Sequence, residues 1–127
     1  MRVQQFLAYF LCLCSPLPVH AQSSAGERSA MQYLEFVGMS KRAPICATRI
    51  AGFAAKFEPA FAKWQKENSV TLEKGESFLR AAAAAAKMDY AAHVGAVTDT
   101  SARLLESASP NIVNETCNAM LQKISAP

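Results

Sequence analysis

Apolar residues recur at helical spacing along most of this chain, and the clearest run follows steps of three and four residues. It begins just after Pro44, whose fixed φ angle suits the first turn of a helix. The run predicts one amphipathic helix from residue 44 to about residue 74, with Gly75 as its stop. Its members are Cys46, Ile50, Phe53, Phe57, Phe61, Trp64 and Asn68.

Pro59 interrupts this predicted helix near its centre. A proline inside a helix costs about 3 kcal/mol and disfavours helical geometry at the residue before it, here Glu58. The apolar spacing nevertheless continues through Pro59 without a shift. Two interpretations follow: the helix is kinked near Glu58, or it ends there and restarts at Pro59.

The remaining apolar residues predict three more helices and no strand. A short first helix covers residues 29–40, with a connector at 41–43, and a long third helix covers 76–107. Ser109 and Pro110 then cap and begin the last helix. The sequence therefore predicts an all-α fold, a small four-helix bundle in one domain over residues 29–127. The inner positions of the last two helices are Leu79, Ala83, Ala86, Tyr90, Val94, Val97, Leu104 or Leu105, Val113, Cys117, Met120 and Ile124.

Two inner residues of the second predicted helix carry polar atoms. Trp64 is expected to pack in the core, because its position matches those of Phe57 and Phe61. Asn68 must find hydrogen-bond partners if it points inward, and a loop backbone near the expected turn is the natural one.

Residues 1–21 have the pattern of a secretory signal peptide. Arg2 supplies the basic start, residues 6–13 form a short apolar run, and Val19-His20-Ala21 fits a small-residue cleavage site before Gln22. Residues 22–28 are mostly small and polar, which is typical of a disordered lead-in. We expect a cleaved, exported chain that is periplasmic or secreted.

Two alternatives to this cleavage are disfavoured. A lipoprotein signal requires a small residue before the lipidated cysteine, but Cys12 and Cys14 each follow a leucine. An uncleaved anchor requires about 20 apolar residues, and the run at 6–13 is far shorter. Cleavage is favoured, with no stable membrane anchor.

Cys46 and Cys117 are the two cysteines that remain after cleavage. In an oxidising compartment they are expected to form one disulfide. An antiparallel hairpin of the second and third predicted helices would place Cys46 near residue 105, and Cys117 lies about two turns into the helix that follows. On the chain-entropy model, closing the 70 residues between the cysteines would stabilise the fold by roughly 4 kcal/mol.

The distribution of charge is more informative than its total. The chain carries a net charge of +3, or +2 without Arg2, which is too small to indicate nucleic-acid binding. Residues 41–66 hold six basic groups against Glu58 alone, a net of +5. A basic row flanking the apolar face is a candidate surface for docking an acidic protein, the alternative being an ordinary solvated helix face. Its members recur every seven residues: Arg42, Arg49, Lys56 and Lys63.

The groups that catalysis or metal binding requires are scarce. Asp89 and His93 share a helical face, but two ligands are too few for a metal site. No serine or cysteine stands in a nucleophile motif with a base beside it. Glu73 and Glu76 flank Lys74 at the turn expected near Gly75, which favours a solvated surface. We expect no enzyme activity, no metal and no cofactor.

The segment CATRIAGFAAKFEPAFAKWQKEN, which contains Cys46, Pro59, Trp64 and Asn68, resembles small exported helical proteins of Gram-negative bacteria. Some proteins of that kind are immunity proteins that neutralise a toxin in the periplasm. The resemblance implies a protein-binding module, with an immunity or inhibitor role as its sharper form, and it assigns no binding residue. The second hypothesis is a structural or chaperone-like component of a cell-envelope assembly, in which the alanine-rich third predicted helix packs against a partner.

Overall fold

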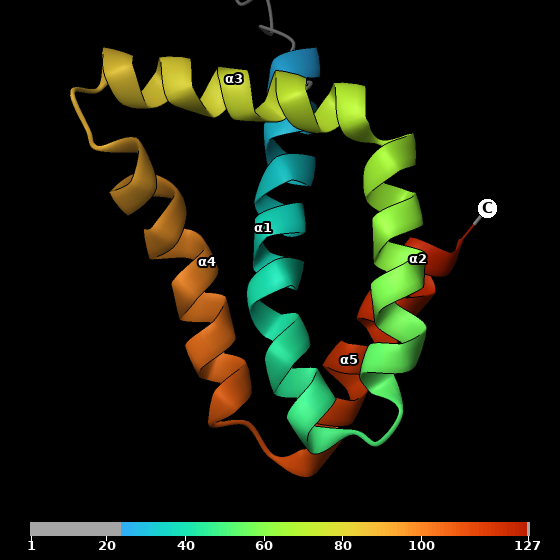
Figure 1. Ribbon diagram of the computed structural model, residues 1–127. Helices are drawn as coiled ribbons and strands as arrows, with labels where there is room; N and C mark the ends of the chain where they lie inside the picture. The colour runs from blue at the N-terminus through green and yellow to red at the C-terminus, as the bar shows by residue number, and fades with distance from the viewer. Residues whose placement is uncertain (1–23, 127) are drawn as a thin grey trace, which may run out of the picture.

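A central helix, α1, supports the other four helices in the computed structural model, which describes residues 24–126 (Figure 1). Helix α3 lies across the N-terminal end of α1, while α2 and α4 flank it on either side (Figure 1). The expected signal peptide lies outside the described residues. The helices are α1 (Ala25–Arg49), α2 (Phe53–Glu67), α3 (Ser69–Ala85), α4 (Tyr90–Glu106) and α5 (Pro110–Ser125).

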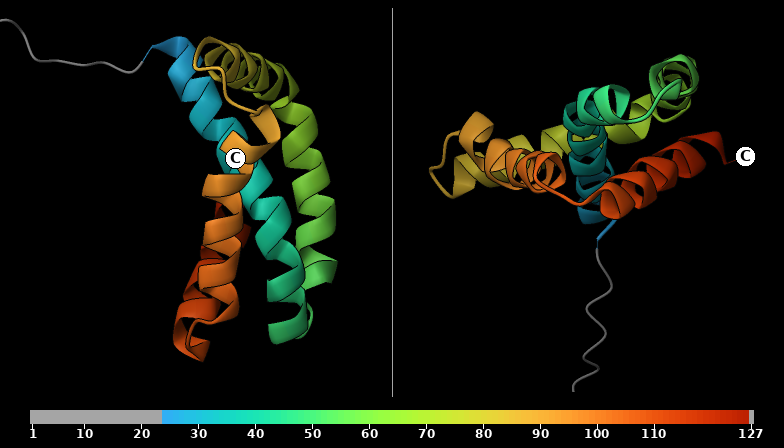
Figure 2. Two further views of the ribbon diagram at one scale, coloured as in Figure 1. Left: turned by 90° about the vertical axis from the view of Figure 1, so that its left-hand side faces the viewer. Right: turned by 90° about the horizontal axis from the view of Figure 1, so that it is seen from below.

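An all-α helical bundle with one disulfide is confirmed, but its layout differs from the predicted one. The described residues form five helices and no strand, instead of four helices built on a long hairpin. In the view from below, α4 and α5 lead away from their connecting loop on different sides of α1 (Figure 2). Helix α5 lies against α1 and α2, whereas α4 lies chiefly against α1.

Helix α1 replaces both the short helix expected at 29–40 and the connector at 41–43. It has 25 residues and contains Pro44 in its interior, so Pro44 does not begin a helix. Met39 and Cys46, on either side of Pro44, are both buried, and this burial outweighs the cost of the proline. At the N-terminus, Ser24 and Glu27 form a capping box, so residues 25–28 are helical and not part of a disordered lead-in.

The helix predicted from 44 to 74 is in fact the end of α1, a turn, α2 and the start of α3. The first break is at residues 50–52, where Gly52 adopts a φ of 77°, a left-handed conformation that glycine takes without steric cost. Pro59 lies inside α2, so the helix does not restart there. The apolar spacing did not predict this break, because the steps of three and four residues continue from Cys46 to Phe57 across the turn.

Asn68 forms the corner between α2 and α3. Its side-chain amide donates a hydrogen bond to the Trp64 carbonyl at 2.8 Å, and its side-chain oxygen accepts one from Gln32 Nε2 at 2.7 Å. Asn68 therefore finds its partners in the backbone of its own helix and in a side chain of α1, and not in a loop backbone as expected. The turn itself lies at Asn68, and no helix ends at Gly75.

The third predicted helix, 76–107, is divided between α3 and α4 by a bend at residues 86–89. Lys87 adopts a φ of 53°, and the N–H groups of Lys87 and Met88 donate to the carbonyls of Ala84 and Ala83 at 3.1 and 2.9 Å. These bonds form a Schellman motif, which ends α3. Asp89 then caps α4 by accepting a hydrogen bond from the Ala92 N–H at 2.8 Å.

The main core lies between α1, α2 and α5. Cys46 and Cys117 are fully buried and form the predicted disulfide, with their Cα atoms 5.8 Å apart. Cys46 reaches Cys117 from the last turns of α1, and not from the start of a hairpin arm. Trp64 is buried as expected, in a row of aromatic rings. That row consists of Phe36, Phe53, Phe57, Phe61 and Trp64.

A second, smaller core joins α1, α3 and α4. Its buried residues are Ala30, Leu79 and Val94, one from each helix. Tyr33 and Tyr90 pack against this cluster, and the Tyr90 hydroxyl donates a hydrogen bond to the Tyr33 hydroxyl at 3.2 Å. Helix α4 thus packs on this smaller cluster near its start, while its Leu105 belongs to the main core.

Candidate protein-binding surface

The four cations of the predicted basic row lie on two different helices. Arg42 and Arg49 belong to α1, and Lys56 and Lys63 belong to α2. The turn at residues 50–52 separates the two pairs, so the seven-residue spacing does not align them along one helix.

Arg42 and Arg49 bind backbone carbonyls of their own chain. Arg42 is half-buried and donates from Nε to the Gly38 carbonyl at 3.2 Å. Arg49 donates from its terminal nitrogen to the Ala108 carbonyl, also at 3.2 Å, which ties the end of α1 to the loop between α4 and α5. The Arg49 bond therefore joins two parts of the fold, whereas the Arg42 bond lies within α1.

Lys56 and Lys63 are exposed on α2, and Lys66 follows one turn later. The three residues are called the α2 lysine surface below. Lys63 lies 3.8 Å from Glu67, with both side chains largely exposed, and a pair of this kind contributes about 0–1 kcal/mol. Neither Lys56 nor Lys66 forms an ion pair or hydrogen bond with any residue between 24 and 126. These ammonium groups remain available to an external acidic group.

Val97 and Leu104 are exposed on one flank of α4. Their exposed fractions are 57% and 66%, although the sequence pattern placed Val97 among the inner residues. The buried residues of α4 are Val94, Thr98 and Leu105, so Leu105 and not Leu104 is the inner leucine. The expectation for Val97 is therefore wrong, because the buried face of α4 is a single narrow stripe directed at α1.

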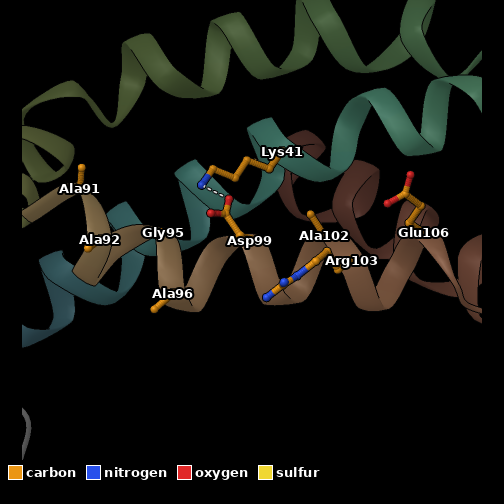
Figure 3. Close-up of a pocket in the computed structure, with 9 residues that line it drawn as sticks. All are labelled: Lys41, Ala91, Ala92, Gly95, Ala96, Asp99, Ala102, Arg103 and Glu106. Carbon is orange, nitrogen blue, oxygen red and sulfur yellow. Dashed lines mark hydrogen bonds and ion pairs between the residues drawn. The ribbon is translucent and has the colours of Figure 1, made fainter.

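An open depression follows the other flank of α4, beside α1 (Figure 3). The ion pair between Lys41 of α1 and Asp99 of α4 crosses it, and Lys41 Nζ also donates to Thr98 Oγ1 at 2.8 Å. This pair neutralises its own charges and attaches α4 to α1. Most α4 residues along the depression are alanine or glycine, and Arg103 and Glu106 also line it.

Arg80 and Tyr90 form the main polar cluster at the junction of α3 and α4. Arg80 donates to Glu76 Oε1 at 2.7 and 3.1 Å, and its guanidinium lies 4.0 Å from the centre of the Tyr90 ring. The hydrogen bond to Glu76 raises the pKa of Arg80. Burial, followed by the hydrogen bond to Tyr33, raises the pKa of the Tyr90 phenol above its usual range. The Arg80 contact joins α3 to α4, and the Tyr90 hydrogen bond joins α4 to α1.

The other titratable candidates have structural positions as well. The Asp89 carboxylate is used to cap α4, and His93 lies four residues into that helix. Glu73 and Glu76 lie within α3 and not at a turn, and Glu76 pairs with Arg80. Among residues 24–126 no group of three or more His, Cys, Asp or Glu side chains is arranged to hold a metal ion.

None of the described helices combines the length and the apolar character that crossing a membrane requires. Comparison with known proteins yields no relative, since no family model, no curated protein and no solved structure matches the chain.

Proposed function

We propose that this chain is an exported, non-catalytic module that binds a protein partner with an acidic surface. The observation that carries the proposal is the α2 lysine surface, in which Lys56 and Lys66 have no partner among residues 24–126. Exposed lysines facing a carboxylate-rich partner accelerate association and make it sensitive to salt. Arg42 and Arg49, in contrast, each donate a hydrogen bond to a backbone carbonyl of this chain.

The packing of α2 supports this assignment. Phe57 and Trp64, each one residue after a lysine of this surface, are buried and stack in the aromatic row. This anchoring fixes the rotation of α2, so the lysines project from a rigid element and lose little backbone freedom on binding. The disulfide fits export into an oxidising compartment, the periplasm or the exterior.

An immunity or inhibitor role is the sharper form of the proposal. It requires a one-to-one complex in which acidic groups of a toxin meet the α2 lysine surface. Size, helical content and the single disulfide agree with the resemblance to exported immunity proteins. The natural candidate for the partner is a toxin encoded next to this protein.

Charge reversal tests the proposal. Lys56→Glu combined with Lys63→Glu should abolish a complex that the wild type forms with a purified neighbouring toxin, as seen by native mass spectrometry. The matched control is Lys74→Glu with Arg103→Glu, which changes the net charge equally on α3 and α4 and should leave the complex intact. Normal binding by the α2 variant would show that these lysines are irrelevant.

A structural or chaperone-like role in an envelope assembly is the second candidate. The observation that favours it is the exposed alanine run of α3, in which Ala83 alone is buried among residues 81–86. Small side chains on a helix surface allow another helix to approach closely. Native mass spectrometry separates the two candidates, since this role gives a self-assembled oligomer or an envelope subcomplex.

A further inference from the structure

The bend between α3 and α4 is built from residues that favour a straight helix. Residues 86–89 contain no glycine or proline, and Ala86, Lys87 and Met88 have high helix propensity. Lys87 nevertheless adopts a φ of 53°, a left-handed conformation that costs a residue with a Cβ about 1–2 kcal/mol. The conformational preferences of these residues therefore favour a straight helix over the observed bend.

Other bonds hold the bend in place. They are the two Schellman hydrogen bonds from Lys87 and Met88 and the cap from the Asp89 carboxylate to the Ala92 N–H. A side-chain cap of this kind contributes about 1 kcal/mol. The gain from the cap is thus similar in size to the cost at Lys87, so losing the cap should favour the straight form at residues 86–89.

Helices α4 and α5, which follow this bend, pack more extensively against the first three helices than against each other. Helices α4 and α5, called the C-terminal arm below, diverge from their loop (Figures 1 and 2). The arm binds α1 through Asp99 with Lys41, Tyr90 with Tyr33, and Lys123 with Glu35. It is also joined to α1 by the disulfide.

We propose that two copies of this chain exchange their C-terminal arms, with residues 86–89 as the hinge. Straightening the hinge joins α3 and α4 into one helix and carries the arm away from its own α1. The arm of the second copy then makes the same contacts on the vacated surface, as in other domain-swapped dimers. The occupant is a second copy because only this chain's own arm carries the matching set of ion pairs, hydroxyl and cysteine.

The exchange makes the dimer covalent. Two intrachain disulfides are replaced by two interchain ones, each joining Cys46 of one copy to Cys117 of the other. Starting from reduced chains, each bond forms when two thiols lose two protons and two electrons to a disulfide oxidant such as oxidised glutathione. Because both cysteines are fully buried, the finished bonds are shielded from thiols in solution, which locks the form present at oxidation.

Isotope mixing tests the exchange without any substitution. Unlabelled and ¹⁵N-labelled chains are reduced, unfolded, mixed, and refolded with oxidised and reduced glutathione at increasing protein concentration. Proteolysis and mass spectrometry then identify the peptides linked through Cys46 and Cys117. Exchange predicts linked peptides with one light and one heavy half, in a proportion that rises with concentration alongside a dimer on non-reducing gels.

Two variants act on the hinge in opposite directions. Asp89→Ala removes the cap of α4 and should raise the mixed fraction several-fold, whereas Lys87→Gly removes the strain of the bend and should lower it. Ser109→Ala is the matched control, because Ser109 occupies the N-cap position of α5 without a side-chain cap bond and should change nothing. Randomly paired cysteines would not respond to the two hinge variants in opposite senses.

Linked peptides that stay purely light or purely heavy in the wild type at every concentration would overturn the inference. If Asp89→Ala does not fold, the wild-type measurement decides alone. Mixed peptides that respond to neither hinge variant would also overturn it, because the hinge would lie elsewhere. The charge-reversal test of the proposed binding function is independent of this result, since α2 lies outside the exchanged arm. A dimer linked between chains through Cys46 and Cys117 does not count as the self-assembled oligomer of the envelope role.

Discussion

Gly75 of α3 lies directly against the backbone of Ser29 in α1. A Cβ atom on Gly75 would stand 2.1 Å from the Ser29 carbonyl oxygen and 2.8 Å from the Cβ of Tyr33. The first of these neighbours is backbone and cannot move aside. Helix α3 can therefore lie across α1 at this distance only because residue 75 has no side chain.

Gly75→Ala should destabilise the protein by about 1–3 kcal/mol, the usual cost of overpacking a close contact, despite the higher helix propensity of alanine.

Gly38→Ala is the matched control, since Gly38 is also buried inside a helix. Its new Cβ would have its nearest neighbours at 3.7 and 3.9 Å, which is ordinary contact. That variant should gain about 0.5–1 kcal/mol. Urea unfolding measures both, and equal losses would contradict the role assigned to Gly75.

The apolar spacing predicted the helical class and much of the core correctly. Phe57, Trp64, Cys117 and Met120 are all buried as expected. The helix boundaries were wrong where Gly75 was taken as a stop and Pro44 as a start, because Gly75 serves a helix crossing and Pro44 is tolerated inside α1. The bend at Asn68 has a hydrogen bond from its side chain to the backbone, and the bend at Lys87 has hydrogen bonds along the backbone. The spacing of apolar residues contains no information about such bonds.

The candidate surface was predictable only in part, for a related reason. The spacing of Arg42, Arg49, Lys56 and Lys63 indicates one row only if they share a helix, and the left-handed turn at Gly52 divides them. The exposure of Leu104 beside the buried Leu105 depends on the direction from which α1 meets α4. Tertiary packing determines which face of α4 meets α1, and the spacing of apolar residues does not distinguish Leu104 from Leu105.

The disulfide should contribute a large share of the stability. Replacing Cys46 and Cys117 together by alanine should lower the free energy of unfolding by up to about 4 kcal/mol, because the unfolded chain regains a long open loop. Urea unfolding with and without dithiothreitol gives the internal control. Reductant should lower the midpoint of the wild type and leave that of the double variant unchanged. An unchanged wild-type midpoint after verified reduction would contradict the prediction.

Tyr90 should make the protein sensitive to alkaline pH. Burial and the hydrogen bond to Tyr33 raise the pKa of its phenol in the folded state above the ordinary value of 10.0. The neutral phenol is therefore favoured by folding, and its stabilising effect is complete below pH 10 and is lost as the pH rises further. Urea unfolding between neutral and alkaline pH should show this decline.

Tyr90→Phe separates this effect from general alkaline unfolding. The variant loses one hydrogen bond, worth about 1 kcal/mol at neutral pH, but it has no phenol to ionise. Its stability should therefore fall less steeply than that of the wild type above pH 10. Parallel curves for the two proteins would show that Tyr90 is not the responsible group.

Gln32 and Asn68 should be energetically coupled, because their side chains join α1 to the corner between α2 and α3 through a 2.7 Å hydrogen bond. In a double-mutant cycle, Gln32→Ala and Asn68→Ala should each destabilise the protein, and the pair together should cost less than the sum by about 1 kcal/mol. Additive losses in urea unfolding would show that the bond contributes nothing.

Asn68→Gly tests whether the corner depends on the side chain or on backbone freedom. Asn68 has a φ of −103°, a conformation open to any residue, so glycine has no conformational advantage there. The glycine variant also loses the bonds to Gln32 and to the Trp64 carbonyl. Glycine also loses more backbone entropy on folding than alanine does. We therefore expect Asn68→Gly to be about 0.5–1 kcal/mol less stable than Asn68→Ala. A glycine variant as stable as the wild type would mean that the amide of Asn68 does not specify the corner.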